Sequence, residues 1–450
     1  MEMRSTKLRL FNRHAAGASF VLALSIGGAG ATACGNDEAV RFDDADAEAE
    51  AGARDDATAS GDELDGSTDV RDTTADAAAF DAAVREVSCE SSSCAIALTR
   101  PIEDSVAAQS FCALLHDGTV TCWGSNSYGQ LGNGLDDRLP SPTPQRVVGL
   151  SDVVSLHGSC ALDKDGSAWC WGAGRDLEGY LQLRGWSPVK LPIPAATRIA
   201  MSAINGCALI EGELQCWGDD NGVFPTPSVS WNTPPTPVPV PGAANARDVV
   251  LNRYAAFLLR DDGTLLSWGG DQAAAGYLGR VTSLAPDRNP DPIPLENVTN
   301  VSVGRYNACA VANGIPYIWG FVQMGRVPDP LPPQPLVIPE RVVQISSTDA
   351  LGTPEVPIPP RWCAVGASGA VYCWGKNATG QAGDGTTEYA ATAVKVPLPV
   401  EAVHVETTED STCALLVTGK VFCWGSNHDG QLGNGKGKTP SLVPTEVLLP

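Results

Sequence analysis

The stretch that decides the fold reads Cys112-Ala-Leu-Leu-His-Asp117-Gly118-Thr-Val-Thr-Cys122-Trp123-Gly124. Apolar runs flank an Asp-Gly pair, and this is among the strongest short signals of a β-hairpin. The closing Trp-Gly recurs at Trp171, Trp217, Trp268, Trp319, Trp374 and Trp424, with spacings of 48, 46, 51, 51, 55 and 50 residues. A turn pair precedes each recurrence: Asp165-Gly166, Glu211-Gly212, Asp262-Gly263, Asn313-Gly314, Ser368-Gly369 and Thr418-Gly419. The pattern predicts seven repeated hairpins.

Further strands complete each repeat. Glycine-rich loops follow Trp-Gly, most clearly at Gly129-Gln-Leu-Gly-Asn-Gly134 and Gly430-Gln-Leu-Gly-Asn-Gly435, with a weaker copy at Gly380-Gln-Ala-Gly383. A proline-flanked strand and then another strand come next, as in Pro144–Val148 and Asp152–Leu156. Residues 89–450 are therefore expected to form an all-β, seven-bladed β-propeller of four-stranded blades, whose radial repetition protects the sheet edges.

The two ends of the repeat region look complementary. The first unit begins with an atypical stretch near Ile102–Ala108, and the chain finishes with the isolated strand Pro440–Leu449. We expect that final strand to complete the first blade and close the ring.

The unit Cys-Ala-Leu-x-x-Asp-Gly-x-Val-x-Cys-Trp-Gly-x-Asn-x-x-Gly-Gln-Leu-Gly-x-Gly resembles the regulator of chromosome condensation repeat over residues 100–450. The resemblance implies a seven-bladed propeller. The glycine-rich loops of units one, six and seven match best, and those of units two to five are degenerate. Some members of the family promote nucleotide exchange on a small nuclear GTPase, and a secreted relative inhibits β-lactamases. Both activities are implied alternatives for this chain.

The cysteines fall opposite one another across the predicted hairpins. The symmetric pairs are Cys112–Cys122, Cys160–Cys170, Cys207–Cys216, Cys363–Cys373 and Cys413–Cys423. Opposed non-hydrogen-bonded positions lie close enough for a disulfide, so we expect structural staples. Zinc binding and redox switching are the alternatives, but two thiolates per blade do not complete a four-ligand zinc site.

Three other cysteines stand apart from these hairpin pairs. Cys89 and Cys94 are expected to close a small loop where the preceding segment meets the propeller. Cys309 faces Ile318 in the fifth hairpin, so we expect a buried free thiol there rather than a nucleophile.

The N-terminus has the features of an export signal. Arg4, Lys7, Arg9 and Arg13 precede the apolar stretch Ala15–Ala31, which predicts a signal peptide over residues 1–33. The residues Ala31-Thr-Ala-Cys34 resemble a bacterial lipoprotein box. In such a box Cys34 would carry the lipid and become the first residue of the mature chain. The chain would then be an outer-membrane or cell-surface lipoprotein, and without lipid it would be secreted or periplasmic.

Residues 34–88 are predicted to be a disordered acidic tether. From Gly35 to Ser88 there are 17 acidic and four basic residues, a net charge of −13 out of −22 for the whole chain. Such a composition does not bury enough apolar surface to offset the ordering entropy. A solvated tail is the alternative to a stalk, and no calcium-loop spacing is present. The acidic balance also argues against nucleic-acid binding.

No catalytic, metal-binding or cofactor-binding motif stands out, so we expect neither an enzyme nor a cofactor. The repeated Trp residues are expected in the core rather than in a ligand site.

The Pro-rich stretches Val223–Pro241 and Val327–Pro339 are expected to form loops on one face, and Phe224 and Trp231 are the candidate contact residues. The predicted function is a monomeric, extracytoplasmic protein-binding module. Binding of a surface glycan, or an enzyme with carboxylates converging over a central channel, is the alternative.

Overall fold

A computed structural model describes residues 85–101, 109–172, 185–202, 205–218, 237–252, 255–270, 275–284, 286–304, 307–320, 332–348 and 361–450. The predicted signal peptide, Cys34 and nearly all of the predicted tether lie outside these residues, as do Phe224 and Trp231. No helix among the described residues is long and apolar enough to cross a membrane.

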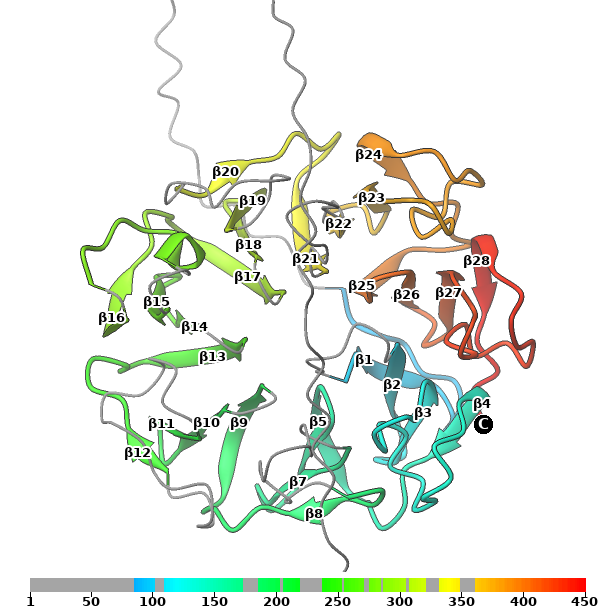
Figure 1. Ribbon diagram of the computed structural model, residues 1–450, viewed down its shortest axis with the longest axis horizontal. Coiled ribbons are helices and arrows are strands. Elements are labelled where there is room, and N and C mark those ends of the chain that lie inside the picture. Colours follow the sequence, from blue (N-terminus) through cyan, green and yellow to red (C-terminus); the bar gives the residue numbers. More distant parts are fainter. Residues whose placement is uncertain are drawn as a thin grey trace, which may run out of the picture. The chain divides into compact units, whose positions relative to one another are not determined.

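Seven four-stranded antiparallel sheets form the blades of the propeller, as the repeats predicted (Figure 1). Blade 1 contains β1 (Ala95–Thr99), β2 (Ser110–Leu115), β3 (Val120–Gly124) and β4 (Ser141–Arg146). Blade 2 contains β5 (Val153–His157), β6 (Cys160–Asp163), β7 (Ala168–Cys170) and β8 (Val189–Lys190). Blade 3 contains β9 (Ala196–Met201), β10 (Asn205–Ile210), β11 (Glu213–Gly218) and β12 (Val238–Pro239).

The remaining four blades repeat this order. Blade 4 contains β13 (Ala246–Leu251), β14 (Ala255–Arg260), β15 (Leu265–Gly269) and β16 (Asp287–Pro292), with the 3-10 helix η1 (Ala275–Leu278) before β16. Blade 5 contains β17 (Val298–Val303), β18 (Asn307–Ala312), β19 (Ile315–Gly320) and β20 (Gln334–Pro335). Blade 6 contains β21 (Val342–Ser347), β22 (Arg361–Gly366), β23 (Val371–Gly375) and β24 (Ala390–Lys395). Blade 7 contains β25 (Ala402–Thr407), β26 (Ser411–Leu416), β27 (Val421–Gly425) and β28 (Ser441–Glu446).

The middle two strands of each blade are the predicted hairpin. In blade 1, Cys112 pairs with Cys122 across β2 and β3. In blade 3, Cys207 pairs with Cys216, and the two-residue turn Glu211-Gly212 has positive φ at both positions, as a type I′ turn requires. The outermost strands carry prolines in five blades, at an edge where a missing N–H costs no ladder hydrogen bond.

The hydrophobic core lies between neighbouring blades. One cluster joins Leu114 and Val120 of blade 1 to Leu156 and Trp171 of blade 2. Another joins Phe111 and Trp123 of blade 1 to Leu415 of blade 7. The described Trp side chains of the Trp-Gly pairs are buried, so they are core residues as expected.

Ring closure differs from the sequence expectation. β28 pairs with β27 and is the outer strand of blade 7, so it does not complete the first blade. Blade 1 already has its own inner strand, β1, directly after Cys94. Because that short strand precedes the atypical stretch near Ile102, the sequence interpretation counted one strand too few in blade 1.

A repeated indole hydrogen bond connects the blades instead. Trp171 Nε1 donates to the Gln130 carbonyl of blade 1 at 2.9 Å, and Trp424 Nε1 donates to the Gln381 carbonyl of blade 6 at 2.9 Å. At the seam, Trp123 Nε1 of blade 1 donates to the Gln431 carbonyl of blade 7 at 3.0 Å. The ring is therefore closed by the same contact that joins its interior blades.

Candidate functional site

Six disulfides are present in the described part of the chain. Five are the cross-strand pairs of blades 1, 2, 3, 6 and 7, with Cα atoms 4.0–4.1 Å apart. The sixth joins Cys89 to Cys94, with Cα atoms 5.6 Å apart. All six are the pairings that hairpin symmetry and chain position predict.

Cys309 is a buried free thiol that pairs with Ile318 in the strand register. Burial raises the pKa of its thiol to about 12, and the Sγ atom lies 3.6 Å from the Ser302 carbonyl oxygen. A thiol with so high a pKa is protonated at neutral pH and is a poor nucleophile.

The inner strand of each blade contains a bulge after its first residue. The bulge skips the second residue, so that the fourth residue points into the core between blades, as buried Leu98, Ile199 and Val405 do. Because strand residues alternate, the third and fifth residues point to the central channel. The third residues are Ala97, Ser155, Arg198, Asp248, Asn300, Gln344 and His404. The fifth residues are Thr99, His157, Ala200, Val250, Ser302, Ser346 and Glu406.

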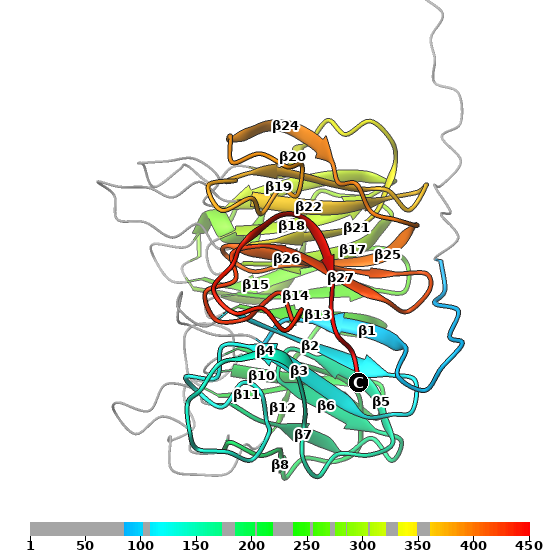
Figure 2. The same ribbon diagram turned by 90° about the vertical axis from the view of Figure 1, so that its right-hand side faces the viewer.

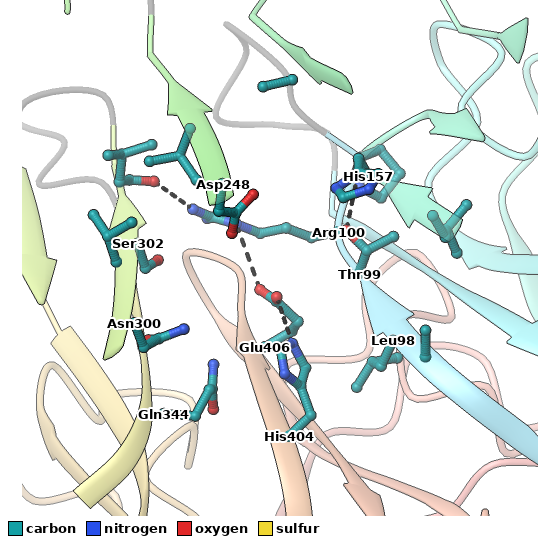
Figure 3. A pocket seen from close by; sticks show the side chains of 18 of the residues that line it. Leu98, Thr99, Arg100, His157, Asp248, Asn300, Ser302, Gln344, His404 and Glu406 are labelled. Atoms are coloured by element: carbon teal, nitrogen blue, oxygen red, sulfur yellow. Dashed lines mark hydrogen bonds and ion pairs between the residues drawn. The ribbon is translucent and has the colours of Figure 1, made fainter. Parts of the chain in front are cut away.

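Most of these residues line a central cavity of about 820 Å³, to which all seven blades contribute. Figure 3 shows Arg100, His157, Asp248, His404 and Glu406 around this cavity. None of these five residues was predicted from the sequence as a site residue. Inner-strand residues differ in identity from blade to blade, so the repeat pattern marks their positions only after the bulge is known.

Arg100 reaches across the channel from the end of β1. Its Nη2 donates to the Val303 carbonyl of blade 5 at 3.0 Å, and its Nε lies 4.0 Å from Glu406 Oε2 of blade 7 (Figure 3). Glu406 also contacts His404 Nε2 at 2.9 Å and accepts a hydrogen bond from Ser346 Oγ at 3.3 Å. The Glu406 carboxylate is therefore already solvated by protein groups.

Asp248, unlike Glu406, is a channel carboxylate with few protein partners among the described residues. Its Oδ1 accepts from the Val249 backbone N–H at 2.9 Å, and within the described ranges it makes no ion pair. His157, two blades away on β5, contacts Ser155 Oγ through Nε2 at 3.0 Å. Burial lowers the pKa of His157, while the Asp248 charge acts in the opposite direction and Arg198 lowers the pKa further. Among the described residues that line the cavity, the carboxylates of Asp248 and of the exposed Glu86 are therefore the ones without a cationic partner.

A second charged group lies at the end of the channel where the β25–β26 connection runs. Lys376 Nζ contacts Glu409 Oε1 at 3.3 Å and Asp410 Oδ1 at 2.8 Å. Gln109 Nε2 donates to Asp410 Oδ2 at 3.2 Å. Burial raises the pKa of Glu409, with Lys376 opposing that shift. These carboxylates are paired, and no group of three metal-ligating side chains occurs among the residues that the structure describes.

The two faces of the propeller carry different connections. In each blade, the connection from the third to the fourth strand, such as the one with Gly430–Gly435, lies on one face, which we call the loop face (Figure 2). The turns between the second and third strands lie on the opposite face, which we call the turn face. Residues 85–94 run along the turn face: Arg85 Nη2 donates to the Ala367 carbonyl at 3.0 Å, and the Ser88 N–H donates to the Val417 carbonyl at 2.7 Å. The connection that holds Phe224 and Trp231 leaves β11 at Gly218 and returns at residue 237, both on the loop face.

One further loop copy escaped the sequence analysis. Gly276-Tyr277-Leu278-Gly279 of blade 4 has Tyr in place of Gln, and the Tyr277 carbonyl accepts from Trp319 Nε1 at 2.9 Å. The fourth loop, which the sequence comparison called degenerate, therefore makes the same interblade contact. The Gly-x-Leu-Gly pattern at residues 276–279 is the sequence signal from which this loop copy could have been recognised.

Comparisons with known proteins agree with this architecture. Residues 117–161 and 418–450 match the regulator of chromosome condensation (RCC1) repeat, and residues 402–431 match a second model of the same description. No curated protein matches the chain.

Solved structures share the fold at low sequence identity. Human WBSCR16 is 18% identical over 74% of this chain and 94% of its own, with a TM-score of 0.58. Prp20p from Saccharomyces cerevisiae, studied for its binding to Gsp1p and histones, is 20% identical over 79% of this chain and 88% of its own, with a TM-score of 0.55. Yeast RCC1 (Prp20) bound to Kap60 is 19% identical over 81% of this chain and 88% of its own, with a TM-score of 0.57. The chain is thus a seven-bladed β-propeller in which residues 117–161 and 402–450 match the regulator of chromosome condensation repeat.

Proposed function

We propose that this chain is a protein-binding module outside the cytoplasm and that it presents its loop face to a partner. The observation that carries the proposal is the course of residues 85–94, which occupy the turn face through the contacts of Arg85 and Ser88. A propeller attached through its turn face leaves the loop face open. The described ends of the connection that contains Phe224 and Trp231, Gly218 and residue 237, lie on that face.

Two further findings support the proposal. Six disulfides are typical of proteins that fold in an oxidising compartment. The fold is shared with Prp20p, which is described in terms of its binding to Gsp1p and histones. Inhibition of a secreted enzyme is a special case of the same function, whereas nucleotide exchange requires the cytoplasmic or nuclear compartment.

Two exposed histidines on opposite faces allow a matched test. His428 lies in the loop-face connection before β28, and His116 lies at a turn-face hairpin tip. In two separate variants of the full-length chain, a photo-crosslinking amino acid replaces His428 or His116, and each variant is irradiated in the cells that produce it. We expect a reproducible crosslinked protein from position 428 that disappears when residues 219–236 are replaced by a Gly-Ser segment. Crosslinks from position 116 alone, or glycan attachment in place of protein, would contradict the proposal.

The proposed location has its own test. Export with lipidation at Cys34 predicts that the N-terminal peptide of the mature protein begins at Cys34 and carries the mass of attached acyl chains. A mature chain that begins at an unmodified Cys34 would indicate free secretion. Retention of Met1 in the mature chain would contradict export.

A further inference from the structure

The central channel is chemically asymmetric. On blades 5 and 7, its wall carries polar groups such as Asn300, Ser302 and Glu406. On blades 3 and 4, the fifth inner-strand residues are Ala200 and Val250, so this part of the wall is apolar. Asp248 stands on the same strand as Val250, two residues earlier, and both therefore face the channel.

Asp248 is the inner-strand carboxylate of the described lining that has no ion pair, whereas Glu86, which also has none, is exposed in the segment 85–94 on the turn face. The Arg100 guanidinium is engaged by the Val303 carbonyl and by Glu406, and Glu406 is engaged by His404. Asp248 has only the adjacent Val249 N–H among the described residues. An ionised carboxylate in a confined cavity gains from a cationic hydrogen-bond donor.

Other ligand classes fit the lining less well. An anion would meet several carboxylates, and both guanidinium groups of the described lining, those of Arg85 and Arg100, are already engaged by protein groups. A sugar ring finds no Phe, Tyr or Trp face among the lining residues. A metal ion lacks three converging ligands among the described side chains.

We propose that the channel is a binding site for a small alkylammonium compound. Its ammonium group donates to Asp248 Oδ2, and its carbon chain lies against Val250 and Ala200. The volume of about 820 Å³ falls within the range of small-molecule sites. This inference goes beyond the proposed partner binding on the loop face and does not depend on it.

Calorimetry with the full mature chain tests the proposal, with butylammonium as the probe and 1-butanol as its neutral analogue. We expect butylammonium to bind, butanol to bind at least about tenfold more weakly, and Asp248→Asn to weaken butylammonium by at least about tenfold. Asp262→Asn is the matched control, because Asp262 lies in an exposed hairpin turn. Equal binding of the two probes, an unchanged Asp248→Asn variant, or no binding at millimolar probe would overturn the proposal.

A second measurement uses the wild-type protein and needs no variant. The charges of Asp248 and Arg198 act on the pKa of the His157 imidazole in opposite directions, and NMR can follow the titration of this imidazole in the wild-type protein. A cation held on Asp248 lowers the apparent pKa of His157, since it cancels the carboxylate charge that raises it. Butanol at the same concentration leaves that pKa unchanged. No shift with saturating butylammonium would place the probe elsewhere and contradict the site.

Discussion

Arg361 is a buried cation at the interface of blades 6 and 7, with no carboxylate in ion-pair contact among the described residues. Its guanidinium donates to the carbonyls of Gln381 at 3.0 Å, Thr408 at 2.9 Å and Ser411, and to Thr412 Oγ1 at 2.8 Å. Burial lowers the pKa of Arg361 to about 9, so it stays charged at neutral pH. Backbone carbonyls substitute for a counterion here.

Replacing Arg361 tests this role. Arg361→Met leaves several buried carbonyls without donors, and we expect it to lower the free energy of unfolding by about 3 kcal/mol or more. Arg361→Lys retains the charge but offers a single nitrogen, so its loss should be intermediate. Urea unfolding of the three proteins gives the comparison. A Met variant within about 0.5 kcal/mol of the wild type would show that the carbonyls find other donors.

At the scale of single elements, the fifth hairpin is a disulfide site with one cysteine missing. Cys309 and Ile318 occupy the register that Cys207 and Cys216 occupy in blade 3, with the same nine-residue separation. We expect Ile318→Cys to form a seventh disulfide with Cys309 under oxidising conditions. Non-reducing peptide mapping would show the linked pair. Two alkylated thiols in the folded variant would contradict the common register.

The glycine-rich loops depend on backbone conformations that other residues adopt at a cost. Gly433 has a φ of 61°, and a Cβ there would lie 2.8 Å from Val447 Cγ1 and 2.9 Å from Trp123 Cδ1. We expect Gly433→Ala to cost about 2–4 kcal/mol, from the left-handed backbone and from overpacking. Gly437→Ala is the control in the same loop, because nothing lies within 4 Å of its Cβ position. Equal unfolding midpoints for the two variants would contradict this account.

The hairpins and the buried Trp residues could be predicted because each has a fixed chemical signature: a turn pair, facing cysteines and Trp-Gly. The channel could not, because third and fifth inner-strand residues range from Ala97 to Asp248 without a shared type. Their common orientation comes from a bulge, which is a matter of backbone register rather than residue identity. The error in ring closure arose because β1 lacks any repeat signature of its own.

At the scale of the whole molecule, the seam between blades 1 and 7 is equivalent to the other interfaces. Trp123→Phe removes the indole donor at the seam, and Trp171→Phe removes its counterpart between blades 1 and 2. We expect each substitution to lower the free energy of unfolding by about 1–2 kcal/mol, because each leaves one buried carbonyl unpaired. Denaturant titration of both variants makes the comparison. A much larger loss for Trp123→Phe alone would indicate that the seam is a special point of weakness.

The disulfides also set how the covalent structure is assembled over time. Every partner lies five, nine or ten residues away along the chain, and none joins two blades. A chain that emerges end-first into an oxidising space therefore meets each correct cysteine before the next blade appears. Correct pairing follows from the order of arrival, so the finished ring needs no late reshuffling of bonds between distant segments.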